Sequence, residues 1–240
     1  SEYKVYRAVQ SGRMVQAVEV LSTAIGAGDM DAAKSAYATA RTAYRHVEAV
    51  SGRIADLENA IDPVATYLVG REQDPGFTGF HRIEFGLWRE ASTAGLKPVA
   101  DKLVADVMAL RDRLKAVKFE PADLAGNAAR EARRLAEGPV ISGDNLYAND
   151  ELAEFAAALE GLEKPASLLL PLASEASPDA AKATTDAFAA ARAELGKLGG
   201  AGSSPIAYGE VSPDARKALA ATFVALADAI DRINPALGLE

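Results

Sequence analysis

Residues 77–88 read Phe-Thr-Gly-Phe-His-Arg-Ile-Glu-Phe-Gly-Leu-Trp, and this stretch holds the only tryptophan and one of only two histidines in the chain. Read as a helix, it places its apolar side chains, His81 and Glu84 at spacings of three, four and seven, which is one helical face. An imidazole and a carboxylate on a face that enters a core need partners, because unpaired burial of charge costs several kcal/mol. Two explanations fit: a buried hydrogen bond between His81 and Glu84, or a metal ion that both side chains bind.

The composition of the 240-residue chain favours a helical protein that captures cations. Alanine-rich sequence with few β-branched runs is typical of helices. The net charge of −8 argues against nonspecific binding to nucleic acid or to anionic membranes. Because the chain has no cysteine, any metal must be held by oxygen and imidazole ligands. No apolar run reaches the roughly 18 residues of a membrane span.

The first half of the chain reads as a group of about four helices. Along the second of these, Tyr37, Arg41, Tyr44 and Glu48 form a row at the margin of the core face. The row is either a polar track beside a site or a solvated face with one Arg–Glu pair. Residues 56–76 then form a connection with a short helical turn, and a connection of this length often serves function.

A further helix is predicted over residues 98–117, after the helix that contains His81. The position of its apolar stripe predicts which of its acidic side chains face the interior. The stripe consists of Leu103, Val107, Leu110 and Leu114. At 100° per residue, Asp106 lies about 70° from the centre of the stripe and Asp101 about 150° away. We therefore expect Asp106 to face the interior and Asp101 to be solvated.

The second half repeats this plan after a linker at residues 119–123. A helix capped by Asn149 or Asp150 is expected to continue through Leu162, with Glu151 near its apolar stripe and Glu160 on the far side. Further on, two Ser-Pro pairs each predict an N-cap followed by proline in the first helical turn. These pairs are Ser177-Pro178 and Ser212-Pro213.

These patterns predict an all-α fold. Helices fall into two groups of about four, which we place in an N-terminal domain over residues 1–118 and a C-terminal domain over residues 123–240. Because the chain starts at Ser1 without methionine, it fits a processed mature form.

The motif Gly79-Phe80-His81-Arg82-Ile83-Glu84 resembles the Gly-x-His-x-x-Glu signature of the imelysin-like family, most closely its EfeO-type iron-uptake branch. The likeness covers nearly the whole chain and includes Ile61-Asp62 and Leu87-Trp88. Two positions depart from the pattern: Asn149 stands where this branch often has His, and Ala158 where it often has Asn. Without a cupredoxin-like extension, the chain resembles the short form of the family and, within it, the periplasmic alginate-binding member.

The resemblance implies two four-helix bundles that face each other across a deep cleft. It also implies metal binding at the His81-x-x-Glu84 pair and delivery of iron to an inner-membrane permease system. The expected protein is a monomeric periplasmic binding protein whose signal peptide is absent from this chain, and it is not an enzyme.

With the resemblance added, we favour a metal site over a bare His–Glu pair. The expected ligands are an imidazole nitrogen of His81 and carboxylate oxygens of Glu84 and Glu48, with Asp106 as the fourth. Oxygen-rich sites with one imidazole suit iron, and they also accept zinc or copper. Arg41 is expected to support Glu48. The other residues expected to line the cleft are Tyr44, Glu151 and Glu160.

Two other functions are consistent with the sequence. A metallopeptidase fits the family name, but the chain lacks the His-Glu-x-x-His helix, and a glutamate used as a ligand leaves no clear general base. Capture of an acidic polysaccharide such as alginate would need a local basic lining. Arg130, Arg133 and Arg134 could supply that lining, although such a cluster is more often an ordinary solvated helix face.

Overall fold

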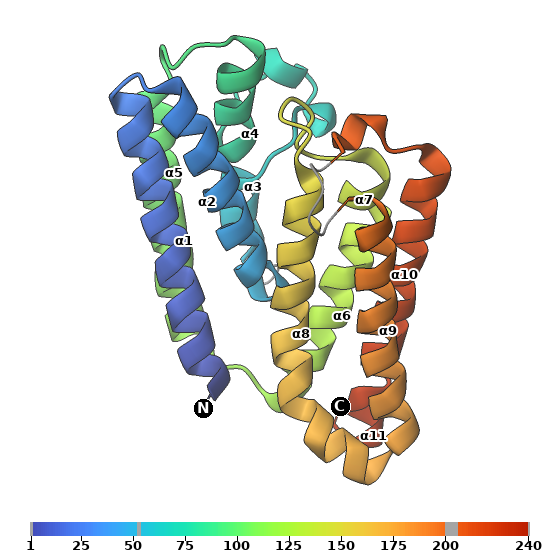
Figure 1. Ribbon diagram of the computed structural model, residues 1–240. Coiled ribbons are helices and arrows are strands. Elements are labelled where there is room, and N and C mark those ends of the chain that lie inside the picture. Colours follow the sequence, from blue (N-terminus) through green and yellow to red (C-terminus); the bar gives the residue numbers. More distant parts are fainter. Residues whose placement is uncertain (1, 52–53, 200–205, 240) are drawn as a thin grey trace. The chain divides into compact units, whose positions relative to one another are not determined.

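The computed structural model describes residues 2–51, 54–199 and 206–239, and all regular structure in these ranges is helical (Figure 1). The predicted all-α fold is therefore confirmed. None of the helices in the same ranges is long and apolar enough to cross a membrane. The arrangement as two four-helix bundles around a deep cleft stays a prediction.

The chain divides into two compact units that exchange short segments. The first unit comprises Ser1–Val47, Ser51–Val117 and Asn145–Ala148, and the second comprises Glu48–Val50, Lys118–Asp144 and Asn149–Glu240. Each unit thus contains a piece of chain from the opposite half of the sequence. The predicted domains at residues 1–118 and 123–240 stay predictions.

The first unit is built around its last helix. Its helices are α1 (Glu2–Gly26), α2 (Met30–Ser51), α3 (Ala55–Ile61), α4 (Gly79–Glu84) and α5 (Lys97–Ala116). Helix α5 packs against α1, α3 and α4. The predicted apolar stripe of α5 is buried, and Asp101 on its opposite side is exposed, so the expected rotation of this helix is confirmed.

The connection predicted over residues 56–76 contains more structure than one helical turn. It holds most of α3 and two 3-10 turns, at Ala65–Tyr67 and Arg71–Gln73. Helix α4 then runs directly into a π-helical turn over Phe85–Arg89. Such π-helical turns are rare and occur frequently at functional sites.

The second unit surrounds one apolar core. Its helices are α6 (Pro121–Glu137), α7 (Pro139–Ser142), α8 (Glu151–Ala176), α9 (Pro178–Lys197), α10 (Pro213–Asp231) and α11 (Ile233–Ala236). Helices α6 and α9 each pack against both α8 and α10. Phe155, Phe188 and Phe223 lie in the core that these four helices share.

Both predicted Ser-Pro caps of the second unit are confirmed. The Ser177 side chain accepts a hydrogen bond from the backbone N–H of Ala180 at the start of α9. The Ser212 side chain likewise accepts from the N–H of Ala215 at the start of α10. Each cap satisfies one backbone N–H that has no partner within its own helix.

Helix α8 is longer than predicted. It was expected to end at Leu162 but continues through Pro165 and Pro171 to Ala176. Each proline removes one backbone hydrogen bond, which normally ends or kinks a helix. Here the continuing helix buries Leu169 and Ala173 in the core, and this tertiary packing outweighs the local cost.

Candidate metal centre

His81 and Glu84 form the centre of the site on one turn of α4. The side chains are buried, with His81 1% and Glu84 0% exposed. His81 Nδ1 lies 2.7 Å from Glu84 Oε2. Because a carboxylate accepts hydrogen bonds, this contact places a proton on Nδ1 and leaves Nε2 as the nitrogen that can bind a ligand.

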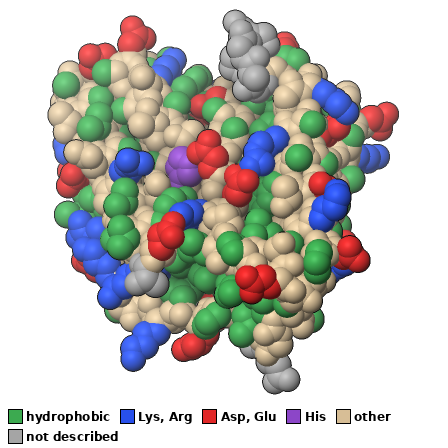
Figure 2. Space-filling view, turned by 60° about the horizontal axis from the view of Figure 1, so that its bottom comes forward, with side chains coloured by type: hydrophobic (Ala, Val, Ile, Leu, Met, Phe, Trp, Pro, Cys, Tyr) green, Lys and Arg blue, Asp and Glu red, His purple; other side chains and the backbone are tan. Residues whose placement is uncertain are grey.

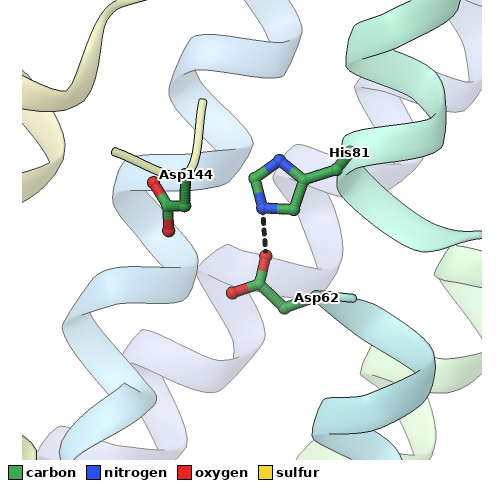
Figure 3. A group of neighbouring side chains, drawn as sticks. All are labelled: Asp62, His81 and Asp144. Atoms are coloured by element: carbon green, nitrogen blue, oxygen red, sulfur yellow. Dashed lines mark ion pairs between the residues drawn. The ribbon is translucent and has the colours of Figure 1, made fainter. Parts of the chain in front are cut away.

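Asp62 faces that second nitrogen. Its Oδ1 lies 3.0 Å from His81 Nε2, and Figure 3 shows the two side chains pointing toward each other. The contact has the distance of an ion pair, but Nε2 makes no properly directed hydrogen bond with any described residue. A buried nitrogen beside a carboxylate, without a directed bond, is a suitable position for a cation.

Gly79 makes this approach possible. Its φ is +70°, and a Cβ atom at this position would lie only 2.2 Å from the carbonyl oxygen of Ile61. The first turn of α4 therefore presses directly against the end of α3. Since Asp62 follows Ile61 in the chain, this backbone contact places its carboxylate beside His81 two residues after the glycine.

Arg41 adds a buried positive charge beside Asp62. Its guanidinium forms an ion pair with Asp62 and is fully buried. Burial would raise the pKa of Asp62, but Arg41 and His81 outweigh it and hold that pKa well below its usual value. Burial would lower the pKa of His81, yet Asp62 and Glu84 raise it to about 10. Without a metal, the site therefore contains an imidazolium paired with carboxylates, and the proton on Nε2 must leave before that nitrogen can bind a metal.

The other oxygen of Glu84 binds a segment from the second half of the chain. The backbone N–H groups of Tyr147 and Ala148 both donate to Glu84 Oε1, at 2.9 Å each. Nearby, the Tyr37 hydroxyl donates to Asn145 Oδ1 at 2.9 Å and lies 3.4 Å from Glu84 Oε2. Both oxygens of Glu84 thus have hydrogen-bond partners within the first unit.

Aromatic rings enclose the polar group. Phe80 packs against Tyr37 and Tyr44, with ring centroids 6.1 and 5.5 Å apart. The Arg41 guanidinium lies 5.0 Å from the centroid of Phe80, within the range of a cation–π contact. Tyr44 thus belongs to the packed wall beside Arg41.

Two of the predicted ligands have other ionic partners. Asp106 is half-buried on α5 and forms an ion pair with Lys102 one turn earlier. Glu48 belongs to the second unit, where its Oε1 accepts from Arg134 Nη2 at 2.7 Å. Asp62, and not Asp106, is the aspartate of the first unit that pairs with His81. Glu48 as a ligand stays a prediction.

The predicted cleft residues Glu151 and Glu160 lie on α8 with opposite exposure. Glu160 is exposed, whereas Glu151 is buried and its Oε2 has no hydrogen-bond partner among the described residues. Burial raises the pKa of Glu151 to about 8, and the nearby charge of Asp144 adds to this shift. Asp144 is the third residue drawn in Figure 3 and belongs to the second unit.

The arginines of α6 have local acidic or amide partners. Arg133 pairs with Asp228 and Asp231 on α10. Charged side chains of both signs are scattered over the face of the molecule drawn in Figure 2. The predicted basic patch is therefore compensated by neighbouring groups. The remaining pairs are Arg134 with Glu48 and Glu131, and Arg130 with Asn127.

The sequence interpretation missed Asp62 as a site residue. It lies just after α3 and before Pro63, in the middle of a connection, so helical periodicity carries no information about its direction. The available signal was the resemblance itself, because Ile61-Asp62 is part of the family pattern. A further hint was the glycine of the motif, which permits close backbone contact.

Comparison with known families identifies the class of protein to which the chain belongs. The model of the family described as Imelysin (Peptidase_M75) matches residues 1–233. The chain therefore belongs to the imelysin family, and the resemblance stated from the sequence is confirmed.

Curated proteins similar to this chain include several named iron uptake system component EfeO. The proteins from Escherichia coli O157:H7, Escherichia coli strain K12 and Shigella flexneri are each 29% identical to this chain over 238 residues. The match covers 99% of this chain but 63% of each relative. The chain thus spans less than two thirds of the length of these relatives.

Proposed function

We propose that this protein is a metal-binding component of an iron-uptake system and that iron is its cargo. The observation that carries the proposal is the buried His81 Nε2. It lies 3.0 Å from the Asp62 carboxylate and has no directed hydrogen bond, while Nδ1 is fixed by Glu84. The name of the EfeO relatives supports iron as the metal.

His81 and Asp62 are the proposed ligands of the first unit. Glu84 donates no coordinate bond in this proposal; it accepts from Nδ1 and orients the ring, as carboxylates commonly do for metal-bound histidines. Arg41 supports Asp62 through their ion pair. One imidazole and one carboxylate also accept zinc or copper, so these metals are useful probes.

The proposed setting is the periplasm, where the protein would pass iron to an inner-membrane permease. The EfeO-type resemblance implies both features. We favour a role without catalysis, although the family carries a peptidase name, because the sequence has no His-Glu-x-x-His helix. Purified protein supplied with zinc or iron should therefore leave unstructured casein uncut. Cleavage that Glu84→Gln abolishes would reverse this preference.

An acidic polysaccharide is a less suitable ligand for the described surface. The arginines that could line a binding site for a polyanion already bind carboxylates or an amide within the second unit. A polyanion would have to displace these partners. The contacts around His81 therefore support metal capture more strongly.

Calorimetric titration with ferrous and ferric iron tests the proposal. We expect His81→Ala and Asp62→Asn each to weaken binding by about tenfold or more, since each removes a direct ligand. Asp101→Asn is the matched control, because Asp101 is an exposed aspartate that pairs with Lys97 on α5. Equal affinity in all three variants and the wild type would place the metal elsewhere.

A further inference from the structure

The carboxylate of Glu84 has two separate sets of partners. Oε2 faces His81 Nδ1 at 2.7 Å, and Oε1 accepts from the backbone N–H groups of Tyr147 and Ala148 at 2.9 Å. Charge-assisted bonds of this kind are roughly twice as strong as neutral ones. If Glu84 bound a metal directly, its buried carboxylate would have to break some of these hydrogen bonds, which costs free energy.

The segment that Glu84 binds belongs to the first unit, but the residues before and after it in the sequence belong to the second unit. Residues Asn145–Ala148 belong to the first unit, although Asp144 and Asn149 on either side belong to the second. Besides Glu84, the segment is held by Tyr37 through Asn145 Oδ1 and by the Tyr147 hydroxyl, which donates to Glu72 at 2.8 Å. We call Asn145–Ala148 the inserted segment.

We propose that Glu84 is a positioning residue and not a metal ligand: it fixes the proton of His81 on Nδ1, fastens the inserted segment beside His81, and keeps both sets of bonds when metal binds. This inference rests on the proposed function, because it concerns what Glu84 does while His81 Nε2 binds metal. It differs from our sequence-based expectation that both residues of the His-x-x-Glu pair bind the metal directly.

Replacing Glu84 with glutamine separates its two proposed roles, which are to accept from His81 Nδ1 and to accept from the N–H groups of the inserted segment. A glutamine at position 84 has one oxygen that accepts and one NH2 group that donates. If its oxygen keeps the Tyr147 and Ala148 N–H groups, its NH2 faces His81 Nδ1, which must then accept. The neutral ring then carries its proton on Nε2 and cannot bind metal there.

The opposite orientation of the glutamine amide preserves the bond to His81 but breaks the bonds to the inserted segment. If the oxygen accepts from His81 Nδ1, the NH2 group faces two backbone donors and the inserted segment loses its acceptor. Glu84→Gln can therefore preserve the metal affinity or the inserted segment, but not both. A direct ligand role for Glu84 makes no such exclusive prediction.

Two measurements on the full chain test this inference. The first is hydrogen exchange at the Tyr147 and Ala148 amides of the wild type, with and without zinc as a diamagnetic probe. We expect both amides to stay protected when zinc is bound. An increase in their exchange of about tenfold or more on zinc binding would show that Glu84 leaves them for the metal and would overturn the inference.

The second measurement compares Glu84→Gln with Glu90→Gln, whose exposed carboxylate pairs with Arg82 nearby. Nitrogen NMR of the His81 ring reports the tautomer, and zinc titration reports affinity. We expect Glu84→Gln either to lose about tenfold in affinity with the proton on Nε2, or to keep affinity with faster exchange at Tyr147 and Ala148. Wild-type behaviour in both respects would overturn the inference.

The outcomes also separate this inference from the proposed function. If the wild type binds neither iron nor zinc, the proposed function fails and the inference fails with it. If the wild type binds metal through His81 and Asp62 but the two amides lose protection on loading, only the inference fails. The wild-type exchange measurement needs no variant, so a misfolded Glu84→Gln would not prevent the test.

Discussion

Gly79 controls the candidate metal centre through a single missing carbon atom. A Cβ at this position would lie 2.2 Å from the Ile61 carbonyl oxygen, and the backbone φ of +70° is itself unfavourable for other residues. The close contact determines where Asp62 lies relative to His81. The spacing of glycine and histidine in the motif thus has a structural reason as well as a chemical one.

We expect Gly79→Ala to lower the free energy of unfolding by about 3 kcal/mol or more, because it combines backbone strain with steric overlap. Gly95→Ala is a matched control, since Gly95 has a φ of +73° but open space around its missing Cβ. This control should cost only about 1 kcal/mol. Urea denaturation measures both, and equal losses would show that the contact with Ile61 contributes nothing.

The raised pKa of His81 predicts how the stability of the metal-free protein depends on pH. A histidine whose folded pKa is raised stabilises the protein fully below its unfolded pKa of about 6.5. That stabilisation is lost as pH rises through the folded pKa of about 10. The free energy of unfolding of the wild type, minus that of His81→Asn, should therefore decrease between pH 6.5 and 10, by at most about 1.4 kcal/mol per pH unit.

Urea titrations of both proteins at several pH values measure this difference. Taking the difference between wild type and variant removes the contributions of groups that titrate equally in both proteins. A difference that grows with increasing pH would mean that His81 is neutral in the folded protein.

At the scale of elements, helical periodicity predicted directions within a helix but not contacts between helices. It placed His81 and Glu84 one turn apart on a buried face and Asp101 on an exposed one, and the structure has them so. The place of Asp62 in the site could not be predicted in this way, because it depends on the contact between the end of α3 and the start of α4. The continuation of α8 through Pro165 escaped because burial in the core outweighed a local signal.

The Ser-Pro caps of α9 and α10 give a prediction at this scale. We expect Ser177→Ala and Ser212→Ala each to destabilise the protein by about 1 kcal/mol, because each leaves a backbone N–H of the first turn without its acceptor. Ser35→Ala on α2 is the control, since Ser35 is exposed in mid-helix, where alanine is favourable. Thermal unfolding of the three variants measures these effects. Equal stability of all three would show that the cap hydrogen bonds do not stabilise the protein.

At the scale of the whole molecule, the exchange of segments means that the two halves of the sequence are not the two units. A chain cut after Val117 would separate Asn145–Ala148 from the unit that contains Glu84. This exchange could not be predicted from the sequence, because hydrophobic patterns report burial and not the unit in which a segment is buried.

We therefore expect a fragment of residues 1–117 to bind metal at least about tenfold more weakly than the full chain. Its Glu84 would lack the N–H donors of Tyr147 and Ala148, and His81 would lose its fixed orientation. Mixing in the complementary fragment of residues 118–240 should restore part of the affinity. Calorimetry measures both, and full affinity in the fragment alone would show that the inserted segment is dispensable.

The same inserted segment has a consequence for the order in which the parts of the protein can form. Translation delivers the N-terminal part first, and domains generally fold as they emerge. The nascent first unit, however, cannot complete the hydrogen bonds of Glu84 until Tyr147 and Ala148 have been translated, well into the second half of the chain. We therefore expect that a polypeptide ending before Tyr147 would have the His-x-x-Glu motif but would lack the hydrogen bonds that hold Glu84 in place.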